Sequence, residues 1–505
     1  MNNAVEQKLS MSGLYITVEG HEKIKLPCRM RNHYAPLKLS NANDKVSVTV
    51  QKNDEHHSVV IHDVQNLEVP EHWTLTLKVG ANRFKGQIIA ADGVTSAAFD
   101  FTIIRGQAQP QWEKILEHAP WAARDSAGEL VFKNRMWLLG GYTPSLANDV
   151  WSSSDGKAWT REGDVPTDAG IDIPVTFEMN GQLFVMDFSG VLFKTNDGKK
   201  WDIASRDVPW RGRLRAGCAV FNGRVWVMGG SSADQQLLND IWSSEDGINW
   251  IQHVEYASWC GRQIDHTPLV HDGKIWLLGG SAMGTIYHPF VAWNDVWCSS
   301  DGIDWQCVRR HAPWRRRIWG STAVYRGRLW LIGGFQSEPA WKNLGDVWYS
   351  SDGEQWHQFE SWHDIEHAGV GEVPFVQTHS HWEARHEQSV YVHDEALWLV
   401  GGMVWPLMND VWRLQINGFQ FVTQPELEMY QNGLYEYAAR ADFHQNDQQV
   451  QYKLITAPDW LNIDAETGHV TGVCSTTGTF LVVIQAAAGQ EMITQSYEVD
   501  VLPLS

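Results

Sequence analysis

The 505-residue sequence contains no long apolar run, and its N-terminus has no basic segment followed by an apolar stretch. A membrane-spanning helix needs about 20 mostly apolar residues. A secretory leader needs a basic start, an apolar centre and a small-residue cleavage site. We therefore expect a cytoplasmic protein with no membrane partner.

Cysteine is also scarce, and the six cysteines are spread along the chain without metal-ligand spacing. This usage is typical of reduced thiols in a reducing compartment. Cys298 and Cys307 flank one predicted hairpin and could face each other across it, but two neighbouring free thiols are the favoured interpretation. The six positions are Cys28, Cys218, Cys260, Cys298, Cys307 and Cys474.

Positive charge is in deficit, with 40 basic against 60 acidic residues and a formal net charge of -20. A surface of this sign repels the phosphate backbone and anionic lipid headgroups. We expect no nucleic-acid partner, although a local basic pocket remains compatible with the composition.

Tryptophan, in contrast, is abundant, with 28 residues, and a repeat with tryptophan at fixed places would explain it. An apolar run ending in Gly-Gly is followed by a variable loop, Asn-Asp-Val-Trp and then Ser-Ser-Asp-Gly-x-x-Trp. Degenerate copies begin at Leu183 and Leu397, and the copy at Leu183 lacks the glycine pair. Clear copies begin at Met136, Val225, Ile275 and Leu329. The chain therefore has six repeats.

Each repeat predicts four short strands, which we call a, b, c and d from the inside outwards. The Asp-Gly pair predicts a tight hairpin turn between c and d, because primed turns need positive φ. The glycine pair ends strand b where a side chain would obstruct neighbouring backbone. The regularly placed tryptophans would fill the space between adjacent repeats.

The glycine doublet and downstream aromatic resemble the kelch family, over Trp112 to about Phe421. The resemblance implies a six-bladed β-propeller, which we place at residues 106–423. Trp112 stands nine residues before Trp121, an interval that recurs along the chain, so residues 111–118 could supply strand d of the last blade. Residues 419–423 compete for the same place, and the sequence leaves both options open.

The flanking regions also read as β-structure. Residues 1–105 alternate apolar and polar positions in short runs, which predicts an N-terminal β-sandwich. Residues 424–505 contain Pro-Asp-Trp-Leu-Asn-Ile-Asp followed by Thr-Gly and Gly-Thr-Phe, and resemble the immunoglobulin-like or cadherin-like modules of bacterial proteins. The expected fold is thus all-β, a kelch-type propeller between two β-sandwiches.

In five repeats the sequence Trp-x-x-Arg stands where strand a begins. In eukaryotic kelch domains that bind acidic peptides, arginines at similar positions line the central channel. The resemblance implies a ring of guanidinium groups suited to carboxylates. The alternative is that these arginines are scaffold residues, paired with nearby acids or stacked on tryptophan. The residues are Arg124, Arg213, Arg262, Arg317 and Arg385.

The loops b–c and d–a emerge on one face, and long variable loops carry function more often than tight turns. The second repeat has a short b–c loop at residues 187–190, whereas the fourth and fifth have long ones at 281–293 and 335–344. We expect the site on the raised side of this mouth, between blades four and six. The raised loops carry Tyr287, His288, Trp293 and Trp341, which with Trp319 are candidate aromatic ligand-binding residues. Packing within the loops is the alternative.

Residues 361–387 hold five of the 21 histidines. The spacing His-x-His in an extended strand puts two imidazoles on one face, about 7 Å apart at their Cα atoms. The histidines of this segment could therefore bind one divalent transition metal ion such as iron, copper, manganese or zinc. Alternatively, they could simply be solvated. The candidate metal ligands are His379, His381, Glu383 and His386.

Two classes of function remain open at this stage. The first is a binding module that holds an anionic small molecule, a glycan or an acidic peptide in the mouth through arginine and aromatic residues. The second is an enzyme, metal-dependent or acid–base, with Glu383, His386 and His266 as candidate catalytic residues. The sequence identifies neither the ligand nor the oligomeric state.

Two kelch enzymes bear on the second class. Kelch proteins that mutarotate sialic acid resemble this propeller, which implies that Arg262 and Arg317 bind a carboxylate while Glu383 or His386 moves protons. Galactose oxidase, another kelch propeller with β-sandwich neighbours, has a similar layout. Its copper site needs two tyrosines and a Cys–Tyr crosslink that we cannot place here, which disfavours oxidase chemistry of that kind.

Overall fold

The computed structural model describes residues 11–18, 23–26, 28–30, 33–34, 37–39, 44–62, 72–78, 80–105, 110, 112–264, 267–282, 291–337, 341–359, 382–445 and 448–503. The regular elements in these ranges are β-strands, which confirms the all-β fold class. Within the same ranges there is no helix of the length and apolar character that crossing a membrane requires.

One compact unit, Gln111–Phe359 with Trp382–Ile416, contains six four-stranded antiparallel sheets that match the six repeats. From inside outwards, blade one comprises β12(Gly128–Phe132), β13(Arg135–Tyr142), β14(Leu146–Ser153) and β15(Thr160–Asp164), and blade two comprises β16(Thr176–Met179), β17(Gln182–Met186), β18(Leu192–Thr195) and β19(Asp202–Ser205). Blade three comprises β20(Gly217–Phe221), β21(Arg224–Met228), β22(Ile241–Ser244) and β23(Trp250–Val254), and blade four comprises β24(Leu269–His271), β25(Lys274–Ala282), β26(Val291–Ser299) and β27(Gln306–Arg309). Blade five comprises β28(Ser321–Tyr325), β29(Arg328–Ile332), β32(Val347–Ser350) and β33(His357–Gln358), and blade six comprises β34(Ser389–His393), β35(Ala396–Met403), β36(Leu407–Gln415) and β11(Trp112–Leu116).

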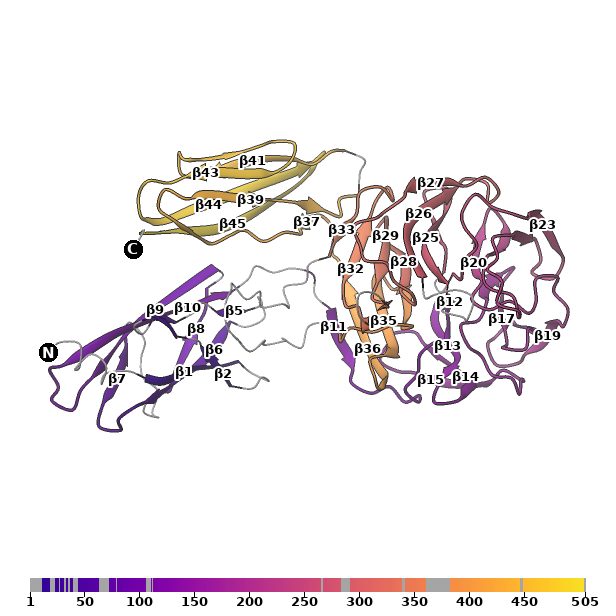
Figure 1. Cartoon of the computed structure of the whole chain (residues 1–505), viewed down its shortest axis with the longest axis horizontal. Coiled ribbons are helices and arrows are strands. Elements are labelled where there is room, and N and C mark those ends of the chain that lie inside the picture. The colour runs from indigo at the N-terminus through magenta and orange to yellow at the C-terminus, as the bar shows by residue number, and fades with distance from the viewer. Residues whose placement is uncertain are drawn as a thin grey trace. The chain divides into compact units, whose positions relative to one another are not determined.

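The blades form a closed ring (Figure 1). The inner strands β12, β16, β20, β24, β28 and β34 contact one another in that order, and β34 also contacts β12. Strand β11 closes the ring as strand d of blade six, because Trp112 pairs with Leu414 of β36. The competing strand β37(Gln420–Phe421) pairs instead with β40(Ala441–Asp442), so the N-terminal option is the one the structure adopts.

The predicted tight Asp-Gly turn is wrong. In blade one, strand c ends at Ser153 and strand d begins at Thr160, so the connection is a longer loop. Asp155 organises this loop, since its Oδ1 accepts the backbone N–H of Lys157 at 2.9 Å and that of Ala158 at 2.8 Å. Asx-type bonds of this kind replace the turn that primed dihedrals would have made.

The glycine of this loop is required by the neighbouring blade. Gly156 has φ 69°, and a Cβ there would lie 2.1 Å from the Trp398 ring of blade six. The same contact recurs between Gly198 and Trp137, and between Gly302 and Trp226. Strand-b tryptophans therefore pack against the next blade, as the sequence predicted.

The repeat also places tryptophan pairs within each blade except the second. Trp121, at the start of blade one, meets Trp159 edge to face with ring centroids 6.0 Å apart. Trp382 and Trp112 make the same contact at 5.9 Å in blade six. Edge-to-face pairs stabilise beyond their buried area, which accounts for much of the tryptophan content.

The N-terminal region forms two sheets around one core. One sheet has the order β2(Ile24–Leu26), β1(Met11–Thr17), β6(Lys45–Lys52), β8(His72–Thr76), and the other β3(Cys28–Met30), β4(His33–Tyr34), β10(Ser96–Arg105), β9(Gly80–Ile89), β7(Ser58–Ile61), with β5(Leu37–Leu39) beside β10. Leu14, Val48, Trp73 and Phe101 belong to the shared core. Alternate burial along β6 follows the alternating sequence pattern.

The C-terminal region likewise has two sheets. The first has the order β38(Glu428–Tyr430), β45(Glu491–Leu502), β44(Gly478–Ala488), β41(Gln451–Thr456), and the second β39(Leu434–Ala438), β43(His469–Val473), β42(Leu461–Ile463). Tyr437, Val470, Ile484 and Val499 lie in their common core. Its relation to immunoglobulin-like or cadherin-like modules stays a prediction.

Candidate functional site

The five arginines of the Trp-x-x-Arg series are bound within their own blades. Arg385 is 1% exposed. It donates to both carboxylate oxygens of Asp410, at 2.6 and 2.9 Å, and to the Gly401 carbonyl at 2.8 Å. The partner is always the aspartate of Asn-Asp-Val-Trp or its variants. The other pairs are Arg124 with Asp149, Arg213 with Asp240, Arg262 with Asp295 and Arg317 with Asp346.

These pairs explain the repeat motif. In blade one the Trp151 indole donates to Asp149 Oδ2 at 2.7 Å, and Asn148 donates to the carbonyls of Val165 and Thr167 on the way to the next blade. Bidentate pairing uses the guanidinium donors that a ligand would need. The geometry therefore favours the scaffold alternative for this series.

The mouth of the channel is lined by the two residues that follow each motif arginine, or Ile171 in blade two. Their backbone joins the blades, since Ser126 N–H donates to Glu387 O at 3.2 Å and Glu387 N–H donates to Trp319 O at 3.0 Å. Because these residues differ between blades, the mouth is asymmetric. The first positions are Asp125, Asp172, Leu214, Gln263, Ile318 and His386, and the second are Ser126, Ile173, Arg215, Ile264, Trp319 and Glu387.

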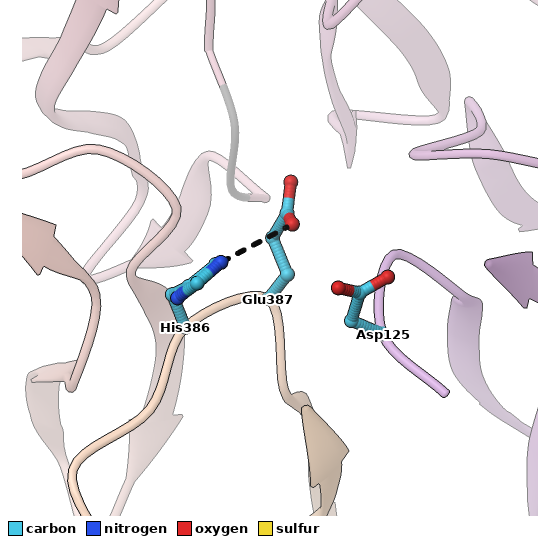
Figure 2. Close-up of side chains that lie close together, drawn as sticks. All are labelled: Asp125, His386 and Glu387. Carbon is cyan, nitrogen blue, oxygen red and sulfur yellow. Dashed lines mark ion pairs between the residues drawn. The ribbon is translucent and has the colours of Figure 1, made fainter. Parts of the chain in front are cut away.

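Three of these side chains converge between blades six and one. Asp125, His386 and Glu387 each offer a nitrogen or oxygen atom, and these atoms lie within 4.8 Å of one another. Figure 2 shows His386 and Glu387 side by side on one segment, with Asp125 facing them from another. The distance from His386 Nε2 to Glu387 Oε2 is 3.9 Å.

The hydrogen bonds around His386 fix its tautomer. The Asn343 amide nitrogen donates to the Met403 carbonyl at 3.0 Å, so the Asn343 oxygen is left as an acceptor. His386 Nδ1 lies 2.7 Å from that oxygen and must carry the proton. The unprotonated Nε2 therefore faces the acids.

Arg215 supplies positive charge at the same place. Its Nη1 lies 3.7 Å from Glu387 Oε1, and its guanidinium carbon lies 5.4 Å from the Trp319 ring centroid. Trp319 in turn stacks on His386, with centroids 4.9 Å apart. Sequence reasoning missed Arg215 because it stands two residues after the motif arginine Arg213, outside the repeated pattern.

Burial shifts the protonation of this cluster. It raises the pKa of Asp125 to about 6, with repulsion from Asp172 adding and the charge of Arg215 opposing. The pKa of Asp172 is also raised by burial. Burial and Arg215 lower the pKa of His386 to about 4. Near pH 6, Asp125 thus exchanges a proton beside a neutral imidazole.

Two cavities lie near these residues: Asp172 and Arg215 line an outer one, and Glu387 lines an inner one. An outer cavity of about 620 Å³ lies over blades two to four and is lined by Asp172, Arg215, Ser231, Gln235 and Gln263 among others. It opens where the b–c connection of blade two is short, as predicted for the lower side of the mouth. The expectation from the sequence, a site on the opposite, raised side between blades four and six, stays a prediction.

The inner cavity, about 80 Å³, lies in the channel and is lined by Glu129 and Glu387 among others. Burial raises the pKa of Glu129 to about 8. This carboxyl is therefore mostly protonated at neutral pH. It forms part of a polar channel below the mouth.

The remaining candidates fall in different places. Glu383 is exposed and lies outside the cluster found among the described residues. Trp293 contacts Arg262, whose guanidinium carbon lies 4.8 Å from its ring centroid. His266, Tyr287, His288, His379 and His381 lie outside the described residues. Cys298 and Cys307 are free thiols.

Asp125, Glu387 and the Nε2 of His386 are donors that divalent transition metals accept. The Arg215 guanidinium next to Glu387 already provides a cation there. A metal ion would meet this positive charge at short range, which costs binding energy in a buried site. The arrangement therefore suits proton transfer better than metal binding.

Six closed blades with a repeated glycine doublet define a β-propeller. Residues 212–243 match the family model of the Kelch motif, and the protein contains a kelch-repeat β-propeller. A solved structure described as YjhT matches with a TM-score of 0.47 and 14% identity, over 60% of this chain and 98% of that chain. The search of curated proteins gave no match.

Proposed function

We propose that the propeller mouth binds a small hydroxyl-rich ligand of the sugar class and transfers protons on it, as in the interconversion of anomers. The observation that supports this most is the convergence of Asp125, His386 and Glu387 beside Arg215. An acid with a pKa near the working pH is what general acid–base catalysis needs. The proposal retains the predicted binding of a glycan or anionic small molecule and adds turnover.

The mouth offers two kinds of surface to such a ligand. The outer cavity is lined by the polar residues Ser231, Gln235 and Gln263. Trp319 presents an aromatic ring, on which the apolar face of a sugar ring can stack. Arg215 would bind a carboxylate of the ligand, the role that the sequence had given to the motif arginines.

The proton transfers balance without a cofactor. Glu387, held against Arg215, takes the proton of the anomeric hydroxyl while the bond between the anomeric carbon and the ring oxygen breaks. Asp125 gives a proton to that ring oxygen. Closure on the other face of the carbonyl returns both protons, so the ligand leaves as the opposite anomer with no net change.

The test is anomer exchange measured by NMR for a panel of neutral sugars, uronic acids and sialic acids. Positioned acid–base groups contribute roughly 100-fold or more, so Asp125→Asn and Glu387→Gln should each lower the rate by at least that factor. Arg215→Ala should raise the KM of carboxylated sugars most. Arg413→Ala, on β36, the third strand of blade six, is the control and should leave the rate unchanged.

Two results would overturn the proposal. One is a wild-type protein that accelerates exchange of no sugar in the panel. The other is acceleration that survives in both acid variants, which would place the chemistry elsewhere.

A further inference from the structure

Two tryptophans stand exposed next to the acid–base cluster. Trp405 is 71% exposed and Trp341 is 74% exposed, whereas most tryptophans of the propeller blades are buried or half-buried. Trp405 lies in the b–c loop of blade six. Trp341 directly precedes β31(Lys342–Asn343), which pairs with β30(Phe335–Gln336) in the b–c connection of blade five.

Aromatic rings connect both tryptophans to the cluster. The Trp405 ring centroid lies 6.2 Å from that of His386. The Phe335 ring centroid lies 5.3 Å from that of His386 and 5.9 Å from that of Trp341. The rings of His386 and Phe335 are buried, so they connect the exposed Trp405 and Trp341 rings to the cluster from beneath the surface.

The backbone at Trp405 is strained. Its φ is 72°, a left-handed conformation that is a genuine outlier for a bulky residue. The turn is held by the N–H of Val404, which donates to the Pro406 carbonyl at 3.0 Å. Strain of this kind persists where the surrounding structure enforces it, and it clusters at functional sites. Because the Trp405 ring is exposed, no burial of that ring offsets the strain.

We infer that the ligand is an extended glycan, whose terminal sugar occupies the acid–base cluster and whose following sugars stack on Trp405 and Trp341. This inference rests on the proposed function and names its substrate class. Tryptophan suits sugar stacking, because it offers a broad apolar face and an indole N–H that can remain hydrogen-bonded. The polar outer cavity lies over blades two to four, so the aromatic surfaces of blades five and six offer a separate path for the chain.

The experiment compares binding of each sugar alone and as the terminal residue of longer chains on one glycan array. Wild type should prefer the longer chains. Trp405→Gly, which removes the ring and tolerates positive φ, should lose roughly two- to tenfold of affinity for chains and keep its affinity for the monosaccharide. Trp341→Ala should lose affinity in the same range. Tyr256→Ala, an aromatic residue 76% exposed after β23, is the matched control.

The melting temperature of Trp405→Gly should be no lower than that of the wild type, because glycine adopts the positive φ without strain. This result would show that the Trp405 ring serves binding rather than folding. Equal affinity for monosaccharides and chains, or unchanged chain binding in both tryptophan variants, would overturn the inference. The proposed function would survive that result if wild type still accelerated anomer exchange of the monosaccharide. If the wild type does not accelerate this exchange, that separate result contradicts both the proposed function and the inference.

Discussion

His386 Nδ1 donates a hydrogen bond to Asn343 Oδ1 over 2.7 Å, across two neighbouring blades. Asn343 is itself oriented by its bond to the Met403 carbonyl. The imidazole is therefore held from one side by an amide, and its free nitrogen is presented to Asp125 and Glu387. A side chain outside the three-residue cluster thus decides which nitrogen of His386 carries the proton.

Asn343→Ala should release the imidazole and slow anomer exchange several-fold with a smaller effect on KM. Asn343→Asp keeps an acceptor for Nδ1 and adds a negative charge, so it should preserve the tautomer and raise the pKa of His386 from about 4. Nitrogen chemical shifts of His386 report both effects. An unchanged tautomer in Asn343→Ala would show that the hydrogen bond does not position the ring.

Removing a motif arginine should destabilise the propeller. Arg385→Ala leaves Asp410, 2–3% exposed, buried without its cation, and breaking such a buried pair costs about 3–5 kcal/mol. Arg413→Ala removes a more exposed partner of Glu113 and should cost less than about 1 kcal/mol. Urea denaturation measures both. A loss below about 1 kcal/mol for Arg385→Ala would return these arginines to the list of ligand-binding candidates.

Stability should depend on pH through Asp125. Its pKa is about 6 in the folded protein and close to 4 in the unfolded chain. Between these values the folded state binds more protons, so this group's contribution to stability falls as pH rises from about 4 to 6 and stays low above that. The lowered pKa of His386 acts in the opposite direction, and the comparison must therefore be between wild type and Asp125→Asn.

Asp125→Asn removes the ionisable group, and its stability relative to wild type should rise by about 1–3 kcal/mol between pH 4 and pH 7. Denaturant midpoints at several pH values measure this difference. A difference that stays constant over the range would mean that the pKa of Asp125 is not raised.

The glycine of the Asp-Gly loop should be more sensitive than a glycine in open space. Gly156→Ala meets both a positive φ and the Trp398 ring at 2.1 Å. Gly181→Ala has a similar φ of 75° and no atom within 4 Å, so it isolates the backbone cost, about 1 kcal/mol. Overpacking should add roughly 1–3 kcal/mol at Gly156.

Combining Gly156→Ala with Trp398→Ala should remove the overpacking and give less than the sum of the two single losses. Thermal or urea denaturation of the single and double variants checks this. Additive losses would show that the loop and the Trp398 ring do not contact each other across the blades.

Much of the fold was predictable because it repeats. Five copies of the glycine doublet and of Asn-Asp-Val-Trp or its variants, with a sixth, degenerate copy that lacks both, predicted the number of blades. The interval between Trp112 and Trp121 offered one of the two candidates for the strand that closes the ring. The Asp-Gly turn was predicted wrongly, because the same dipeptide serves a two-residue hairpin or a longer Asx-organised loop. Only the pairing of strands c and d separates these two.

The candidate site was less predictable. His386 and Trp319 were among the predicted residues and lie at the mouth, but Asp125, Arg215 and Glu387 were not predicted as site residues. A repeat draws attention to positions that recur, whereas this cluster consists of positions where the blades differ. The arginines that recur are neutralised by aspartates about 25 residues or more further along, a pairing that strand register decides.

The sequence by itself determined the all-β class, the six blades and the residues that make each blade alike, since these follow from local pattern and periodicity. Tertiary structure alone decided which charges neutralise one another and which face the channel. Ring closure brings Asp125 of the first blade beside His386 and Glu387 of the last. Residues about 260 positions apart therefore share one desolvated site, whose pKa values no local pattern encodes.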